Sequence, residues 1–174
     1  ESERVLGAAL RGRRDEVYVA SKVSPENCQP ENLRASCEAS LRRLRTETID
    51  LYQIHWPFRH VPFADVYGEL DTLRCEGKVR AIGVCNFGRE DLSSWMGDGE
   101  CCSNQIGYNL LFRAAEYDML PACRKLGVGV LAYMPLLQAN RGGLTIHVRV
   151  AGDPQRLLPV IEKAVRAADP NVPV

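Results

Sequence analysis

Residues 50–57 read Asp-Leu-Tyr-Gln-Ile-His-Trp-Pro, and this stretch decides the fold. Its β-branched and aromatic residues predict a short buried strand, which the proline ends. Strand alternation puts one set of side chains on one face (Leu51, Gln53, His55) and the rest on the other (Asp50, Tyr52, Ile54, Trp56). Parallel α/β folds bind ligands at the carboxyl ends of their strands, so His55 is a candidate site residue. The alternative is a structural role, which is more common for an isolated histidine.

A second strand is predicted at residues 17–22, and it also ends in a polar residue, Lys22. Strands and helices then alternate along the chain. The predicted strands are 17–22, 49–56, 79–87, 103–109 and 128–133, and the predicted helices are 3–10, 30–44, 63–74, 89–95 and 115–126. Crossovers of this length predict parallel strands covered by helices, in either a doubly wound sheet or an eightfold barrel.

The first strand is not followed by the Gly-x-Gly-x-x-Gly turn of dinucleotide-binding folds, and this absence favours the barrel. Closure of a (β/α)8 barrel, or TIM barrel, needs eight strands. The predicted fold class is therefore α/β, a partial TIM barrel with five parallel strands.

Composition narrows the functional classes. The 174 residues are 45% hydrophobic and 25% charged, which is typical of one globular domain. A formal net charge of zero argues against a nucleic-acid partner, and no apolar run is long enough to span a membrane. The seven cysteines match no zinc-binding spacing. We therefore expect a cytoplasmic protein with reduced thiols, no metal site and no membrane partner.

Several stretches together resemble the aldo-keto reductases. They occur in the order and spacing of that family and cover about residues 3–138. The matching stretches are Ala-Ser-Lys at 20–22, Ser-Leu-Arg-Arg-Leu at 40–44, Ile-Asp-Leu-Tyr-Gln-Ile-His-Trp-Pro at 49–57, Gly-Lys-Val-Arg-Ala-Ile-Gly-Val-Cys-Asn-Phe at 77–87, Asn-Gln at 104–105 with Tyr-Asn at 108–109, and Val-Leu-Ala-Tyr at 130–133. The resemblance implies an aldo-keto reductase barrel that reduces small-molecule aldehydes or ketones to alcohols with NADP(H).

The resemblance also implies catalytic roles for Lys22 and His55. In the family a lysine lowers the pKa of a proton-donating tyrosine, and a cation beside a phenol has this effect because it favours the phenolate. The family histidine orients the carbonyl, and His55 would donate a hydrogen bond to the oxygen on which negative charge develops. Trp56 would border the substrate.

Four residues match the positions at which the family binds its cofactor. Asn86, Gln105 and Cys85 would contact the nicotinamide carboxamide, and Tyr133 would stack on the nicotinamide ring. The position of Cys85 is often a serine in the family, and a thiol is a weaker hydrogen-bonding group than a hydroxyl.

The chain departs from the family in the catalytic aspartate and tyrosine, which belong to a region upstream of residue 1. Tyr18 lies four residues from Lys22, roughly 13 Å along a strand, and Tyr52 faces away from His55. We therefore expect impaired reduction by this chain. The alternative is a catalytically inactive remnant or fusion that at most binds a ligand or partner. The sequence leaves the carbonyl substrate open.

The C-terminal stretch departs as well. Residues 139–143 read as a linker, 144–150 alternate as a strand, and a helix with an apolar face follows. Residues 144–174 resemble part of the extracytoplasmic domain of macrolide-exporter-type ABC permeases, and the alternative is a divergent βα unit that patches the barrel. The predicted division is a partial reductase barrel at 1–138 and an unrelated or divergent tail at 139–174. We also expect self-association through the open sheet edges.

Overall fold

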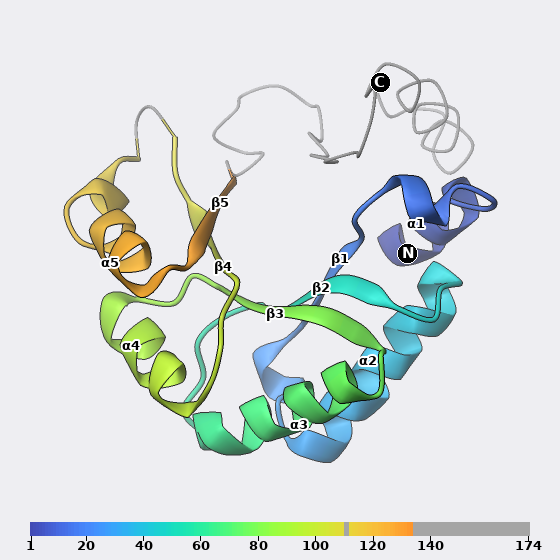
Figure 1. The fold of residues 1–174 in the computed structure, drawn as a ribbon, viewed down its shortest axis with the longest axis horizontal. Helices are drawn as coiled ribbons and strands as arrows, with labels where there is room; N and C mark the ends of the chain where they lie inside the picture. The colour runs from blue at the N-terminus through green and yellow to red at the C-terminus, as the bar shows by residue number, and fades with distance from the viewer. Residues whose placement is uncertain (110–111, 134–174) are drawn as a thin grey trace.

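The described part of the chain forms one curved, parallel, five-stranded sheet. The structure is a computed structural model, and it describes residues 1–109 and 112–133. The strands pair in sequential order and are β1 (Ala20–Val23), β2 (Ile49–Ile54), β3 (Val79–Cys85), β4 (Ser103–Gly107) and β5 (Gly129–Tyr133). The helices lie on the convex side of the sheet (Figure 1). A doubly wound sheet would have helices on both faces and a reversal of strand order, so the predicted partial barrel is confirmed.

The helices begin and end where the sequence provides the right residues. They are α1 (Ser2–Ala9), α2 (Pro30–Leu44), α3 (Phe63–Cys75), α4 (Arg89–Asp98) and α5 (Met119–Leu126), with 3₁₀ turns at Arg14–Glu16, Pro25–Asn27 and Ala114–Glu116. Pro30 occupies the first turn of α2, where its missing N–H costs nothing. Arg45 ends α2 in the left-handed conformation, with φ of 56°.

Some predicted boundaries were wrong. The first strand begins at Ala20 instead of residue 17, because the N–H of Val19 donates to the Asp50 carboxylate (2.8 Å) instead of to a neighbouring strand. The predicted helix 115–126 is split into a 3₁₀ turn and α5. Pro121 explains the split, since its ring would clash with the carbonyl of Tyr117 in a continuous helix.

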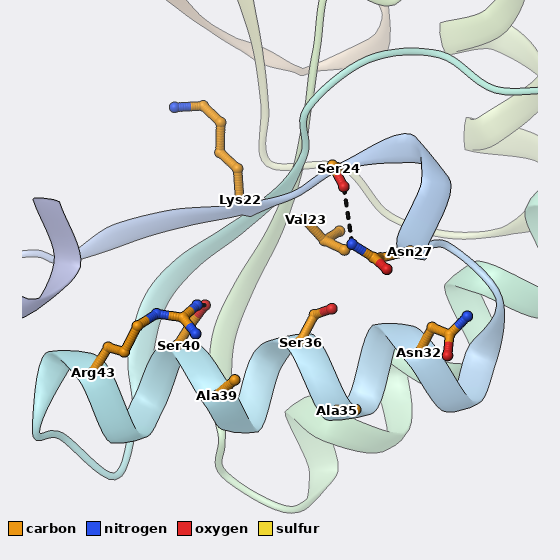
Figure 2. A pocket seen from close by; sticks show the side chains of 10 residues that line it. All are labelled: Lys22, Val23, Ser24, Asn27, Asn32, Ala35, Ser36, Ala39, Ser40 and Arg43. Atoms are coloured by element: carbon orange, nitrogen blue, oxygen red, sulfur yellow. Dashed lines mark hydrogen bonds between the residues drawn. The ribbon is translucent and has the colours of Figure 1, made fainter. Parts of the chain in front are cut away.

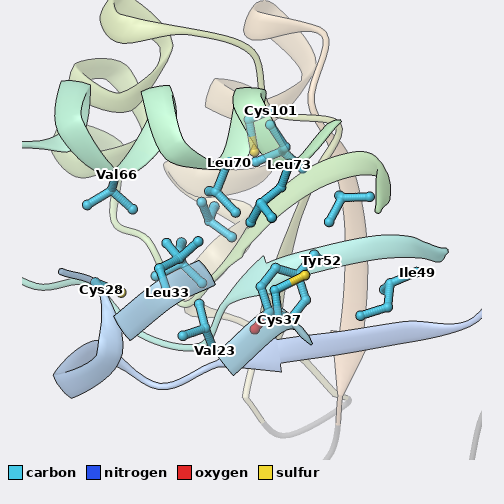
Figure 3. Packing of buried hydrophobic residues seen from close by; sticks show 14 of the residues in the cluster. Val23, Cys28, Leu33, Cys37, Ile49, Tyr52, Val66, Leu70, Leu73 and Cys101 are labelled. Atoms are coloured by element: carbon cyan, nitrogen blue, oxygen red, sulfur yellow. The ribbon is translucent and has the colours of Figure 1, made fainter. Parts of the chain in front are cut away.

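The convex face of the sheet is a closed core. Tyr52 and Ile54, which the strand alternation placed on the same face of β2, are fully buried. Figure 3 shows this core from close by, with side chains of α2 and α3 packed against the strands. The fully buried helix side chains are Leu33 and Cys37 of α2 and Val66, Leu70 and Leu73 of α3.

The concave face is more open. Strand register places Lys22, Gln53, Gly83, Ser103 and Gly129 in one layer across the sheet. Lys22 and Gly129 at the two edges are exposed, whereas Gln53 in the middle is buried. The next layer toward the carboxyl ends contains the pair formed by Cys85 and Gln105, and then Leu131. The inward side of each strand thus carries the polar residues that the sequence singled out.

At the amino ends of the strands, Asp50 forms a buried ionic network. Its carboxylate bonds the Arg14 guanidinium at 2.6 Å, the Arg80 guanidinium at 2.8 Å and the Val19 N–H at 2.8 Å. The Asp50 side chain is only 4% exposed, so these partners replace the water that it loses on folding.

Two further observations concern the whole chain. In the ranges that the structure describes, no helix is both long and apolar enough to cross a membrane. The predicted boundary at residue 138 and the predicted strand and helix of the tail lie outside the described residues.

Candidate active site

Lys22 lies on the inward side of β1. Figure 2 shows its side chain on the opposite side of the strand from α2. A groove of about 480 Å³ lies on the α2 side, with small and polar side chains such as Ser36 and Arg43 along it. The ammonium group of Lys22 points away from this groove and toward the concave face of the sheet.

His55 directly follows β2, whose last residue is Ile54, so its ring lies at the carboxyl end of the strand. Partial burial lowers the pKa of His55 below its ordinary value of 6.5, and the nearby Lys22 cation lowers it further, against a smaller opposing effect of Glu26. The imidazole is therefore neutral at neutral pH and can donate one hydrogen bond. The structure brings together the two residues for which catalytic roles were expected.

The Lys22 ammonium has no hydrogen-bonded carboxylate or phenol among residues 1–109 and 112–133. Tyr18 is 63% exposed, and the ring of Tyr52 is buried in the core on the convex side. Neither tyrosine is placed to give a proton beside His55.

Asn86 follows β3 in the left-handed conformation, with φ of 57°. Its N–H donates to the carbonyl of Gln105 on β4 (2.8 Å). Its side-chain Oδ1 accepts a hydrogen bond from the Tyr133 hydroxyl at the end of β5 (2.9 Å). Three residues for which cofactor binding was expected are thus joined across three neighbouring strands.

Cys85 is the last residue of β3 and is 1% exposed. Burial raises the pKa of its thiol to about 11, against a small opposing effect of Lys22. The thiol is therefore protonated at neutral pH. Its Sγ lies 4.0 Å from Oε1 of Gln105, a weak contact between two side chains that the pairing of β3 with β4 places in the same layer.

These side chains fit the carboxamide of a nicotinamide. A carboxamide offers one carbonyl acceptor and two N–H donors, and the complementary groups are offered by the amides of Asn86, directly after β3, and Gln105, within the adjacent β4. Trp56 is 48% exposed, with its ring centroid 6.3 Å from that of His55, so an apolar wall lies beside the histidine. No cluster of three or more metal-binding side chains occurs in the part of the chain that the structure describes.

Asn104 is a polar residue of this region to which the sequence analysis assigned no role of its own. It lies on the core-facing side of β4, between Val84 and Val130 in register, and its exposure is 0%. Its amide bonds the backbone of Phe87, just after Asn86. The sequence could have indicated a role for Asn104, because it is a polar residue at a strand position where alternation predicts an apolar one.

The fold and the polar carboxyl ends define part of a (β/α)8 barrel whose concave face carries its candidate site. Comparison with known proteins agrees. The family model described as "Aldo/keto reductase family" matches residues 1–153. This chain belongs to the aldo/keto reductase family.

Individual relatives support the same assignment. The chain is 41% identical over 143 residues to Methylglyoxal reductase YeaE of Escherichia coli, covering 80% of this chain and 50% of that protein. It is 39% identical over 131 residues to an NADH-specific methylglyoxal reductase of the same organism, covering 73% and 40%. A crystal structure of an aldo/keto reductase from Klebsiella pneumoniae, in complex with NADP and acetate, is similar with a TM-score of 0.75 and 39% identity, covering 80% and 50%. The chain thus spans about half the length of these relatives.

Proposed function

We propose that this chain carries the nicotinamide- and carbonyl-binding part of an NADP(H)-dependent reductase of aldehydes or ketones. The observation that carries the proposal is the placement of four residues on four adjacent strands, in a member of this family: Lys22 and Gln105 lie within β1 and β4, and His55 and Asn86 directly follow β2 and β3. The solved relative in complex with NADP supports the choice of cofactor.

In this proposal NADPH, when bound, supplies a hydride to the carbonyl carbon. The neutral imidazole of His55 donates a hydrogen bond to the carbonyl oxygen, where negative charge develops during reduction. The amides of Asn86 and Gln105 hold the nicotinamide carboxamide, and Tyr133 covers the ring. The Lys22 ammonium favours the anionic form of a proton donor beside it, which lowers the pKa of that donor.

We propose a small aldehyde or ketone as the substrate. Two methylglyoxal reductases among the relatives support a small carbonyl compound of this kind. Trp56 borders the space beside His55 and would limit the size of the substrate. Seven free cysteines support a reducing, cytoplasmic location for the activity.

We further propose that this chain by itself reduces carbonyls poorly. Within the described ranges Lys22 has no tyrosine hydroxyl beside it, and general acid catalysis typically contributes about 10²–10⁴-fold to a rate. The alternative, a chain that binds ligand without turnover, is favoured by the same observation. Among the described strands, β1 and β5 each pair on one side only, and this supports self-association. Size-exclusion chromatography with light scattering would detect it as a mass that grows with concentration.

The test combines NADPH fluorescence titration with a steady-state assay of NADPH oxidation in the presence of methylglyoxal. We expect saturable binding with a Kd above about 1 μM, and turnover well below about 1 s⁻¹. Asn86→Ala should weaken binding, whereas Ser36→Ala, in the groove on the α2 side, should leave it unchanged. Turnover near 1 s⁻¹ would show that a proton donor is present, and absence of saturable binding would refute the nicotinamide site.

A further inference from the structure

Asn104 holds the backbone that follows β3. Its Nδ2 donates to the Phe87 carbonyl (2.9 Å), and its Oδ1 accepts from the Phe87 N–H (3.4 Å). Nδ2 also contacts Sδ of Met119 at 3.5 Å. This pairing imitates one step of a β-ladder and fixes the orientation of the amide, because a flipped amide would place donor against donor. The fully buried amide of Asn104 is thus satisfied by both backbone groups of Phe87 and by the Met119 sulfur.

The side chain of Phe87 is held as firmly as its backbone. It is 1% exposed, stacks on Phe63 at a centroid distance of 5.5 Å and meets Trp95 edge-on at 5.8 Å. The residue after Asn86 is therefore fixed at both its main chain and its side chain. The residue before Asn86, Cys85, is fixed in the sheet by its pairing with Gln105.

Asn86 is the single left-handed residue between these two fixed points. The left-handed conformation is unfavourable for residues other than glycine, although less so for asparagine, and it persists where the surroundings impose it. The Asn86 N–H is used by Gln105 and its Oδ1 by Tyr133. Among the described residues no acceptor bonds its Nδ2, so this donor is left for a ligand.

We propose that Asn104 is a positioning residue for the nicotinamide site: by bonding both backbone groups of Phe87, it holds Asn86 in the left-handed conformation that presents its amide to the nicotinamide carboxamide. Asn104 itself lies in the core and does not touch the ligand. The inference rests on the proposed function for its binding consequence, whereas the effect on the backbone is independent of any ligand.

The binding test compares NADPH with 2′-phospho-ADP-ribose, which is the same cofactor without nicotinamide, in wild type, Asn104→Ala and Asn104→Asp. We expect NADPH to bind about tenfold more weakly to Asn104→Ala, the loss of about one ligand hydrogen bond, with no change for the fragment. Asn104→Asp keeps the acceptor for the Phe87 N–H, so its affinity for NADPH should lie between that of wild type and that of Asn104→Ala. The matched control is Ser103→Ala, since the neighbouring buried hydroxyl has no partner among the described residues.

Amide hydrogen exchange of the wild type provides the ligand-independent measurement. The Phe87 backbone amide and the Asn104 side-chain amide should both exchange slowly. Rapid exchange of either amide would refute the proposed hold of Asn104 on the Phe87 backbone, even if the variants fail to fold. Equal loss of affinity for NADPH and for the fragment in Asn104→Ala, or no loss for either, would also refute it. If wild type binds neither ligand, the proposed function fails, and slow exchange at both amides would still support the effect of Asn104 on the backbone.

Discussion

The two ends of β2 place polar groups in opposite situations. At the amino end, the Asp50 carboxylate is 4% exposed and has two guanidinium partners and one backbone N–H. At the carboxyl end, His55 is exposed, and no hydrogen bond or ion pair holds its ring within the described ranges. Polar groups that hold the fold are satisfied by the chain itself, whereas those available to a ligand are not. Barrels generally divide stability and chemistry between their two ends in this way.

The loop after β3 combines a polar group available to a ligand with a residue packed in the core. The amide of Asn86 points to the candidate site, but the next residue, Phe87, lies in a packed aromatic cluster with Phe63 and Trp95. The carboxyl end therefore has open polar groups on a rigid base. Such a base is what a binding site needs, because ligand-binding groups must keep their geometry before the ligand arrives.

The largest predicted effect concerns the two tryptophans. Trp95 is completely buried under the loop after β3, whereas Trp56, beside His55, is 48% exposed. We expect Trp95→Ala to lower the free energy of unfolding by about 3–5 kcal/mol. Trp56→Ala should lower it by less than about 1 kcal/mol. Urea denaturation followed by circular dichroism measures both free energies. Equal losses in the two variants would contradict a rigid aromatic cluster beneath the loop after β3.

The amino end should be the next most sensitive. Asp50→Asn keeps the shape of the side chain but removes the charge that bonds Arg14 and Arg80. We expect a loss of about 1.5–3 kcal/mol in the free energy of unfolding, the range for hydrogen bonds to a charged group. The control is Arg80→Met, which should cost less than about 1 kcal/mol because the Arg80 side chain is 63% exposed. An unchanged free energy of unfolding in Asp50→Asn would mean that the network contributes nothing to stability.

The carboxyl end should tolerate the removal of its polar groups. We expect His55→Ala and Lys22→Met each to change the free energy of unfolding by less than about 0.5 kcal/mol, because neither side chain is held by an ion pair in the described structure. The same denaturation experiment applies. A loss as large as that of Asp50→Asn would assign a structural role to the residue and remove the contrast between the two ends.

The smallest predicted effect is on the titration of His55. Burial and the Lys22 cation lower its pKa, so the unfolded chain binds this proton more tightly than the folded chain. The contribution of His55 to stability is therefore present above pH 6.5 and declines as the pH falls below that value. Lys22→Met should raise the pKa of His55, and Glu26→Gln should lower it, as measured by the pH dependence of the ring proton shifts. An unchanged pKa in Lys22→Met would show that the two groups are not coupled.

The fold was predictable because its signals are periodic. Alternation in residues 50–57 and helical spacing of apolar residues were enough to predict five parallel strands with covering helices. The boundaries at 17–22 and 115–126 were not, because they depend on a hydrogen bond to Asp50 and on the ring of Pro121. Interactions of this kind involve single residues and leave no periodic pattern.

The roles of the predicted site residues stay predictions, and their geometry could not be predicted from the sequence. The resemblance named Lys22, His55, Asn86, Gln105 and Tyr133. The structure places Lys22 and Gln105 within β1 and β4, Tyr133 at the end of β5, and His55 and Asn86 directly after β2 and β3. The bond from the Tyr133 hydroxyl to Asn86, and the left-handed backbone of Asn86, depend on side-chain placement and on a dihedral angle that a pattern of residue types does not encode. Stacking of Tyr133 on a nicotinamide ring stays a prediction.

The most direct test of a ligand site at the open carboxyl end is residue-resolved NMR of the whole chain during titration with NADPH. We predict that the largest shift changes occur at Lys22, His55, Asn86, Gln105 and Tyr133, and that Asp50 and the groove residue Ser36 stay unchanged. Shift changes confined to that groove or to the amino ends of the strands, or no change at saturating NADPH, would contradict the account.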